Sequence, residues 1–313
     1  MLHRLKTIRQ YFEFLLVMVV GEICRFLSPD NAVALGRLLG QVGYFLAFRR
    51  RPVALANLRL CYGAGVSPIE RARLVQRVYE HLGMTFTECF LLPGWIESGL
   101  FDRRVTIEGE EILRDALRQG KGVIVVTGHI GNWEVVGFAV SRTLGRVVSV
   151  GKPLSNHLLD SYLRKLRNRA GQELVPTDGA VGAMIKELQQ GGVVGLLVDQ
   201  RASHGGATLR FFGIEASTHT TPAALALKYG SPIVILYDRR IGRRFRHRIK
   251  VLDPILPEAG TREESLLRTS QRINDTLEAI IRAEPDQWLW VYSRWKKKRP
   301  RRRSGSRAPS VSK

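Results

Sequence analysis

Hydrophobic and polar residues follow two different patterns along the chain, and the change lies close to residue 105. Before it, leucines and small residues recur at steps of three and four over 28–48, 49–63 and 67–92. This spacing places apolar side chains on one face of an α-helix. We therefore predict that residues 29–104 are mostly helical.

From residue 105 onward, short apolar runs rich in β-branched residues alternate with amphipathic helical segments. The predicted strands lie at 105–109, 122–127, 146–153, 172–177, 193–199, 207–213, 231–240 and 246–255. Apolar strands that are separated by helices form a largely parallel sheet covered on both faces. We predict an α/β fold over residues 105–295, with helices around a mostly parallel mixed sheet.

The first 28 residues are predicted to form a membrane-anchoring helix. Their uninterrupted apolar stretch runs only from Phe14 to Gly21, between Glu13 and Glu22. A spanning helix needs about 20 mostly apolar residues. Residues 11–27 would cross a membrane only if the charged flanks reach back to its surface; otherwise the helix lies in the interface. A buried core helix is the alternative, and a signal peptide is disfavoured because no small-residue cleavage site follows the apolar run.

The charge balance indicates an anionic partner. The 313 residues include 49 Lys and Arg against 28 Asp and Glu, for a formal net charge of +21. Nucleic acid, an acidic protein and an anionic membrane surface all fit this balance. Ten basic residues and no acidic one lie from Arg294 onward, and we predict a disordered basic tail over residues 296–313. Beside an apolar N-terminus, this tail favours anionic lipid, because each Lys or Arg near such a surface contributes about 1 kcal/mol.

Cysteine usage and missing motifs exclude several kinds of site. Cys24, Cys61 and Cys89 are odd in number and widely spaced, and the chain has no CxxC pair. This argues against a disulfide framework and a zinc site, and it indicates a reducing compartment. The sequence also lacks the HExxH, GxSxG and P-loop patterns. We predict neither a metal nor a cofactor.

The stretch VTGHIGNWEVVG, residues 126–137, contains the strongest candidate for chemistry. An apolar strand precedes it, and Asn132 is a suitable N-cap for the helix that follows. His129 therefore lies in a strand-to-helix turn between two glycines. Residues five apart on one helix point to different faces, so His129 contacts Glu134 only if the histidine folds back over the first helical turn. The glycines allow that path.

Such a contact would make His129 a general base. Glu134 would accept the proton of one imidazole nitrogen and leave the other nitrogen free to deprotonate a substrate hydroxyl. Backbone N–H groups at the helix start would face the negative charge that develops on an attacked carbonyl. The alternative is a turn histidine that makes only local hydrogen bonds, and spacing does not separate the two.

Several motifs together resemble one family of enzymes. GHIGNWE, preceded by IEGEEILRDALRQGKGVIVVT, is similar to the motif of a histidine, four residues and an acid in the late acyltransferases of lipid A biosynthesis. These are the lauroyl and myristoyl transferases, within the glycerolipid acyltransferase superfamily. The likeness spans nearly the whole chain and includes RRRPVALANLRLCYG, GMTFTECFLLP, GGVVGLLVDQ, LRFFGIEASTHTTPAALALKYGSPIV and EPDQWLWVYSRWK.

The resemblance implies an acyltransferase domain over residues 29–295 that acts on a lipid hydroxyl. The donor would be acyl carrier protein or acyl-CoA, and the acceptor a membrane glycolipid such as a lipid A precursor. The enzyme would lie at the inner, cytoplasmic membrane of a bacterium, with its active site on the cytoplasmic face. RASHGG after Gln200 differs from the acidic pattern of some lipid A enzymes. A phosphatidylinositol mannoside or a lysophospholipid therefore stays open as the acceptor.

The resemblance also implies roles for individual residues. His129 matches the general base of the family and Glu134 its orienting acid. Asp199 and Gln200 match a pair that ends a core strand and lines the site; without the resemblance, Asp199 could equally be a turn or cap acid.

Four cations are candidates for binding phosphate at the mouth of the site. Arg167 and Arg169 match arginines that hold phosphate or the donor in the family. Lys152 and Arg201 have chemistry suited to the same task. In so basic a chain, the alternative for each of the four is a solvated surface charge.

Two further alternatives concern the end of the chain and the charge. DQWLWVYSRWKK, residues 286–297, is typical of a membrane-interface segment, unless Trp288 and Trp290 pack against the sheet. A membrane-tethered nucleic-acid-binding protein would explain the charge. However, much of the excess charge lies in the tail, and the sheet region lacks the aromatic and basic motif of RNA-binding sheets. We therefore predict no specific nucleic-acid partner.

Overall fold

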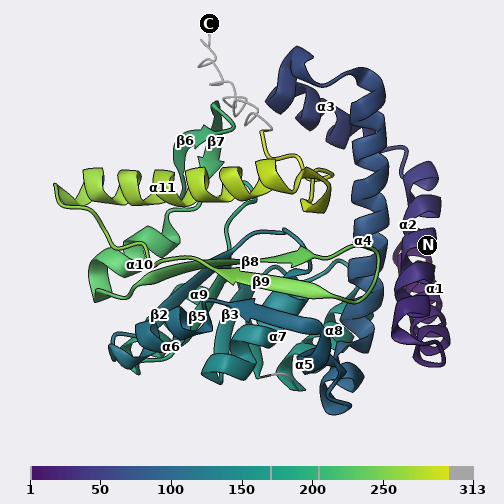
Figure 1. Ribbon diagram of the computed structural model, residues 1–313, viewed down its shortest axis with the longest axis horizontal. Helices are drawn as coiled ribbons and strands as arrows, with labels where there is room; N and C mark the ends of the chain where they lie inside the picture. The colour runs from purple at the N-terminus through teal and green to yellow at the C-terminus, as the bar shows by residue number, and fades with distance from the viewer. Residues whose placement is uncertain (1, 170, 204, 296–313) are drawn as a thin grey trace, which may run out of the picture.

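The first hundred residues form helices, as their spacing predicts. The computed structural model describes residues 2–169, 171–203 and 205–295 (Figure 1), so the predicted tail over 296–313 lies outside the described residues. Ser67 and Glu70 cap the longest helix through two reciprocal hydrogen bonds. The elements of this region are α1 (Leu2–Arg25), α2 (Pro29–Leu46), α3 (Arg51–Tyr62), the 3₁₀ turn η1 (Gly63–Gly65), α4 (Pro68–Glu97) and α5 (Leu100–Arg104).

Strands and helices alternate after α5. The strands are β1 (Val105–Glu108), β2 (Val123–Thr127), β3 (Val147–Gly151), β4 (Gln172–Pro176), β5 (Val193–Leu197), β6 (Ala207–Phe211), β7 (Ile214–Thr218), β8 (Ile233–Arg240) and β9 (His247–Val251). The helices are α6 (Glu110–Arg118), α7 (Trp133–Leu144), α8 (His157–Arg169), α9 (Ala180–Gln189), α10 (Thr221–Tyr229), α11 (Arg262–Ala283) and the 3₁₀ turn η2 (Pro285–Gln287).

Seven of these strands form one sheet, in the order β1-β9-β8-β2-β5-β3-β4. The block β8-β2-β5-β3-β4 is parallel, β9 is antiparallel to β8, and β1 is parallel to β9. This confirms the predicted α/β fold with a mostly parallel mixed sheet. β6 and β7 form a separate antiparallel hairpin. The sequence did not predict β7, because Ile214 is its only large apolar residue.

A hydrophobic core fills each face of the sheet. Ile124 and Val126 of β2 belong to the core beneath α9, α10 and α11, whereas Val123 and Val125 belong to the core beneath α6 and α7. The long helix α4 runs past one end of both layers (Figure 1) and supplies residues to both cores. Since both faces are covered, ligands reach a sheet of this kind at the carboxyl ends of its parallel strands.

Helices α1 and α2 pack on α4 with one side and leave the other side open (Figure 1). Cys24 and Ala32 are buried against Leu91 of α4. Residues 8–48 carry large apolar side chains, each at least 39% exposed, which we call the N-terminal apolar face. Its members are Ile8, Tyr11, Phe12, Leu15, Leu16, Val19, Ile23, Phe26, Leu38, Leu39, Val42, Phe45, Leu46 and Phe48.

The helix predicted for the first 28 residues is present as α1. In the part of the chain that the structure describes, no helix combines the length and the apolar character needed to cross a membrane. The spanning form of the anchor is therefore not supported. The form that lies in the interface stays a prediction.

Candidate active site

A turn between β2 and α7 presents His129 at the carboxyl end of β2. Oδ1 of Asn132 accepts two N–H groups of the first helical turn at 3.0 and 3.3 Å, which confirms the predicted N-cap. Gly131 has a φ of +58°, and a Cβ at this position would overlap the carbonyl oxygen of Asp238. Glycine is therefore required for the turn to approach β8 so closely.

The imidazole of His129 is bound to Asp199. β2 and β5 are parallel neighbours with Thr127 opposite Leu197, so the residues two positions beyond each strand lie together. Nδ1 of His129 lies 2.8 Å from Oδ1 of Asp199, and the backbone N–H of His129 donates to Oδ2 at 2.8 Å. The side chain of Asp199 is 2% exposed and that of His129 is 18% exposed. The imidazole of His129 thus lies at the edge of the interior and is partly exposed to solvent.

Asp199 is ionised and holds His129 in one tautomer. Burial by itself raises the pKa of Asp199, but the charge of His129 and hydrogen bonds from His129 and Trp288 outweigh burial and lower it. Nε1 of Trp288 donates to Oδ2 of Asp199 at 2.8 Å. Because the ionised carboxylate accepts the proton on Nδ1, the lone pair of the neutral ring is on Nε2. A general base requires this arrangement.

Gln200 lies at the nitrogen that carries the lone pair. Its Nε2 is 3.3 Å from Nε2 of His129. Since the neutral imidazole can only accept there, the amide of Gln200 donates. A substrate hydroxyl that approaches His129 would meet this amide beside the base. Gln200, predicted to line the site, does contact His129.

The predicted contact between His129 and Glu134 is wrong. The carboxylate of Glu134 accepts from Nε of Arg167 at 2.9 Å and from its Nη2 at a shorter distance, and it accepts from Nε1 of Trp133 at 3.1 Å. The ring of Trp133 meets the ring of His129 edge-on, with 5.0 Å between centroids. Glu134 therefore reaches the base only through Trp133, because the first turn of α7 directs the carboxylate towards α8. A catalytic role for Glu134 stays a prediction.

Four of the N–H groups around the start of α7 are already hydrogen-bonded. Gly131 donates to the carbonyl of Gln287 at 2.9 Å, and Asn132 donates to Oδ2 of Asp238 at 2.7 Å. The backbone N–H groups of Glu134 and Val135 donate to Oδ1 of Asn132. These four groups are therefore not free to bind a carbonyl oxyanion. Among the described residues the N–H of Trp133 makes no hydrogen bond, so the predicted use of the helix start stays a prediction for that group. The donor that the structure does show beside Nε2 of His129 is the amide of Gln200.

Known proteins share the sequence pattern of this chain. The pattern that defines the bacterial lipid A biosynthesis acyltransferases matches residues 3–297. The chain belongs to this family.

Three relatives show how far the similarity extends. The lipid A biosynthesis lauroyltransferase of Escherichia coli (strain K12) is 27% identical over 271 residues, and the palmitoleoyltransferase of the same organism is 25% identical over 269 residues. Both alignments cover 84% of this chain and 84% of the relative. The phosphatidylinositol mannoside acyltransferase of Mycolicibacterium smegmatis is 22% identical over 212 residues, covering 66% of this chain and 67% of its own.

Family membership confirms the resemblance and the predicted enzyme class. The protein is a lipid A biosynthesis acyltransferase family member and an O-acyltransferase, which uses an acyl donor and a lipid acceptor. The membrane-tethered nucleic-acid-binding protein is therefore disfavoured as an explanation of the positive charge.

The predicted cations of this acyltransferase lie in different surroundings. Arg167 binds Glu134 through Nε and Nη2, which leaves Nη1 as the guanidinium nitrogen available to another ligand. Lys152 and Arg169 are exposed, and Arg201 is half-buried. The side chains of these three make no hydrogen bond and no ion pair to the described residues. Phosphate binding by any of the four stays a prediction.

Trp288 is a site residue that sequence reasoning missed. It is 3% exposed and Trp290 is fully buried, so the membrane-interface interpretation of these two tryptophans is wrong. Ile130 pairs with Trp288 in a short antiparallel bridge, and Leu289 donates its N–H to the carbonyl of His129 at 3.2 Å. This segment thus holds the backbone of the turn, and the indole of Trp288 holds the carboxylate of Asp199. No spacing predicts it, because Trp288 and Asp199 lie 89 residues apart.

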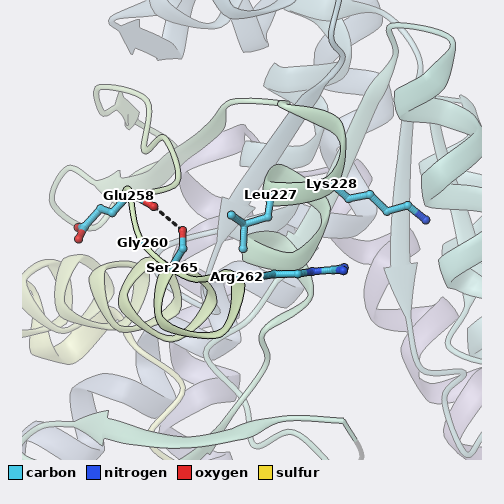
Figure 2. A pocket seen from close by; sticks show the side chains of 6 residues that line it. All are labelled: Leu227, Lys228, Glu258, Gly260, Arg262 and Ser265. Carbon is cyan, nitrogen blue, oxygen red and sulfur yellow. Dashed lines mark hydrogen bonds between the residues drawn. The ribbon is translucent and has the colours of Figure 1, made fainter.

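Two hollows elsewhere on the acyltransferase do not include the base. One of about 490 Å³ lies between α10 and α11 (Figure 2), where the hydroxyl of Ser265 donates to the carbonyl of Glu258 at 2.6 Å. Lys228 and Arg262 extend from it in the same direction (Figure 2). The other, of about 410 Å³, lies between α4, β8 and η2. Neither is lined by His129 or Asp199, so we assign no substrate to them.

Proposed function

We propose that this enzyme moves a fatty acyl chain from an acyl thioester, with acyl carrier protein as the expected carrier, to a hydroxyl group of a lipid A precursor. The observation that carries the proposal is the pair of His129 and Asp199 at the carboxyl edge of the sheet, with Nε2 of His129 at 3.3 Å from the amide of Gln200. The names of the two Escherichia coli relatives support lipid A as the acceptor class.

The mechanism is direct transfer without a covalent acyl-enzyme. Nε2 of His129 takes the hydroxyl proton as the hydroxyl oxygen bonds to the thioester carbon. The carbonyl electron pair moves onto its oxygen, and the amide of Gln200 donates to this oxyanion. The C–S bond then breaks, the carbonyl re-forms, and the departing thiolate takes the proton from the imidazolium. Asp199 stays ionised and stabilises the imidazolium throughout.

An assay of acyl transfer with defined substrates tests this mechanism. Acylated carrier protein and a detergent-dispersed lipid A precursor are incubated with the enzyme, and mass spectrometry follows the gain of one ester-linked acyl chain. We expect His129→Ala to lose the activity, with circular dichroism and the melting temperature as folding controls. A correctly folded His129→Ala protein with a near-wild-type rate would overturn the assignment of the base.

The acceptor requires a separate comparison, because one relative acts on a different lipid. The Mycolicibacterium smegmatis relative is a phosphatidylinositol mannoside acyltransferase. The same assay with a phosphatidylinositol mannoside and with a lysophospholipid therefore ranks the three acceptors. Faster transfer to either alternative would replace lipid A in the proposal. Mass spectrometry of membrane lipids from cells with and without the protein gives an independent answer.

The N-terminal apolar face supports a location at the cytoplasmic surface of the bacterial inner membrane. Exposed apolar patches on helices are typical of membrane-interface binding, and a net charge of +21 favours anionic lipid and an acidic carrier. Leu16, 54% exposed, lies on this face, whereas Leu256, 57% exposed, lies outside it. We expect Leu16→Asp to weaken co-flotation with anionic vesicles and Leu256→Asp to leave it unchanged. Equal flotation of the two variants would contradict this location.

A further inference from the structure

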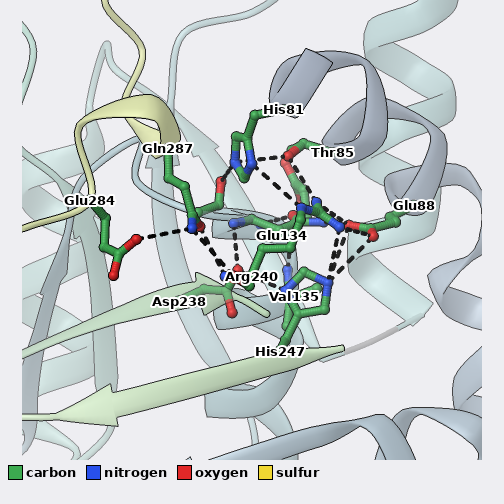
Figure 3. A network of polar contacts seen from close by, with 12 residues as sticks. His81, Thr85, Glu88, Glu134, Val135, Asp238, Arg240, His247, Glu284 and Gln287 are labelled. Carbon is green, nitrogen blue, oxygen red and sulfur yellow. Dashed lines mark hydrogen bonds and ion pairs between the residues drawn. The ribbon is translucent and has the colours of Figure 1, made fainter. Parts of the chain in front are cut away.

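Four ionisable side chains, drawn in Figure 3, are buried together, and two of them are hydrogen-bonded to the turn that carries His129. Glu88 comes from α4, Asp238 and Arg240 from β8, and His247 from β9, and none is more than 4% exposed. We call them the buried charge cluster. They lie outside the pair formed by His129 and Asp199, and the mechanism above does not use them.

The cluster is balanced only when His247 is an imidazolium. Arg240 donates to Glu88 through Nη2 at 2.7 Å and through Nη1 at a shorter distance. Nδ1 of His247 lies 2.8 Å from Oδ2 of Asp238, and its Nε2 lies 3.4 Å from Glu88. Both ring nitrogens therefore face carboxylates, and Nη1 of Arg240 also lies 3.5 Å from Nε2. Only a ring with an N–H group on each nitrogen donates to both carboxylates. When His247 is protonated, the two carboxylates of the cluster are balanced by its two cations.

The charges around His247 support this assignment. Burial by itself lowers the pKa of His247, and Arg240 lowers it further, but the carboxylates of Asp238 and Glu88 outweigh both and raise it to about 9. Burial alone would raise the pKa of Glu88, and Arg240 and His247 instead hold it well below its usual value. At neutral pH Glu88 is therefore an anion and His247 a cation.

The cluster is joined to the turn at Asn132. Oδ2 of Asp238 accepts the backbone N–H of Asn132 at 2.7 Å, and Oε2 of Glu88 accepts its side-chain N–H at 2.7 Å. The other end of the Asn132 amide caps α7. One residue therefore connects both carboxylates of the cluster to the end of the turn that begins at His129.

His81 joins the cluster to the preceding residue of the turn. Its Nε2 lies 3.0 Å from the carbonyl oxygen of Gly131, and its Nδ1 lies 3.4 Å from Nε of Arg240. Burial and the charge of Arg240 lower the pKa of His81 to about 3, so the ring is neutral. Since the guanidinium only donates, Nδ1 accepts and Nε2 carries the proton that binds Gly131.

We propose that the buried charge cluster, with His81, positions the catalytic turn, so that Asp238, Glu88 and His81 are positioning residues for His129. This inference rests on the proposed function, because it assumes that His129 is the base. The cluster contacts no reacting atom. It fixes the backbone of Gly131 and Asn132, two and three residues after His129, and thereby the direction in which Nε2 points. Small displacements of a base cost rate far more than they cost substrate affinity.

The main experiment follows kcat and KM against pH in Asp238→Asn. Asparagine still accepts from the N–H of Asn132 but removes the charge that keeps His247 protonated. We expect the alkaline decline of kcat, near pH 9 in the wild type, to move towards neutral pH by about one unit or more, with KM within about twofold. A pH profile of kcat that superimposes on the wild type would overturn the proposal.

Glu187 provides the matched control. It is also a buried carboxylate in an ion pair, at 2.6 Å from Arg146, but it lies on α9 and does not contact the turn. We expect Glu187→Gln to lower the melting temperature and leave the pH profile of kcat unchanged. If Glu187→Gln moved the profile as much as Asp238→Asn, general destabilisation would explain both and the proposal would fail.

A second pair of variants decides the question if Asp238→Asn does not fold. His81→Gln retains a side-chain N–H for the carbonyl of Gly131, whereas His81→Leu does not. We expect His81→Leu to lower kcat about tenfold with little change in KM, and His81→Gln to restore kcat to within about twofold. Wild-type kcat in folded His81→Leu would overturn the proposal. An inactive His129→Ala beside it would show that the proposed function stands and only the positioning role fails.

Discussion

His129 at the sheet edge and His247 in the buried charge cluster each have Nδ1 at 2.8 Å from an aspartate oxygen. The two pairs differ at the second nitrogen. Nε2 of His129 meets the amide of Gln200, whereas Nε2 of His247 meets the carboxylate of Glu88. The ring of His129 is also partly exposed, and that of His247 is fully buried.

This difference shows that an aspartate alone does not make a histidine into a base. A second carboxylate keeps a proton on both nitrogens of His247, so that ring carries a permanent charge at neutral pH. A neutral amide donates to the lone pair of His129 without adding a charge beside it, and a substrate hydroxyl can replace the amide as the donor. The second neighbour therefore decides whether the imidazole takes up protons during catalysis or contributes a fixed charge to the structure.

Removing the base should have the largest effect. We expect His129→Ala to lower kcat about 10³-fold, within the range of about 10²–10⁴ that general bases contribute. The described side chain at Nε2 is the amide of Gln200, which cannot act as a base in its place. Steady-state acyl transfer from carrier protein measures the loss. The melting temperature should stay close to the wild type, since the ring is partly exposed; a large fall would mean that His129 is structural as His247 is.

The charge on His247 should appear as pH-dependent stability. Its pKa is about 9 in the folded protein against 6.5 unfolded, so its contribution is complete below about pH 6.5 and is lost as the pH rises through about 9. The loss is on the order of 3 kcal/mol. Denaturant titrations across this window measure the free energy of unfolding. His247→Asn, which keeps a donor towards Asp238, should lack the decline; the same decline in that variant would assign it to other groups.

Replacing Asp199, the acid of the catalytic pair, should have the next largest effect on kcat. In Asp199→Asn an amide group faces Nδ1 and favours the tautomer with the proton on Nε2, so we expect kcat to fall about 10²-fold. Trp288→Phe is the control, because it removes one donor to Asp199 and keeps an aromatic ring. It should retain most of the activity. Comparable losses in both variants would mean that packing, not the tautomer, is what Asp199 controls.

The smallest effect is expected at Glu134. Because its carboxylate binds Arg167 and Trp133 and does not contact His129, Glu134→Gln should lower kcat by no more than about tenfold. The measurement is the same transfer assay, run beside Asp199→Asn. A loss at Glu134 that exceeds the loss at Asp199 would reverse the assignment of the two acids.

Local sequence patterns predicted much of the fold and part of the site. The apolar run of β2, the glycine-flanked turn and the N-cap at Asn132 each depend on neighbouring residues, and all three are present. The contact with Glu134 was predicted from its closeness in sequence and is wrong, because α7 directs that side chain towards α8. Asp199 was recognised as the end of a core strand. His81 and His247 have no informative spacing, because their partners come from other strands and helices.

The sequence by itself determined the order of most strands and helices, with β7 as the exception, as well as the turn that carries His129 and the family to which the chain belongs, since these follow from local periodicity and motifs. Only the tertiary structure decided which acid meets the base. β5 lies between β2 and β3 in the sheet, with β4 farther out, and this strand order brings Asp199 to His129 across 70 residues of sequence. Strand order depends on how helices bury their apolar sides on both faces of the sheet, which no short stretch of sequence specifies.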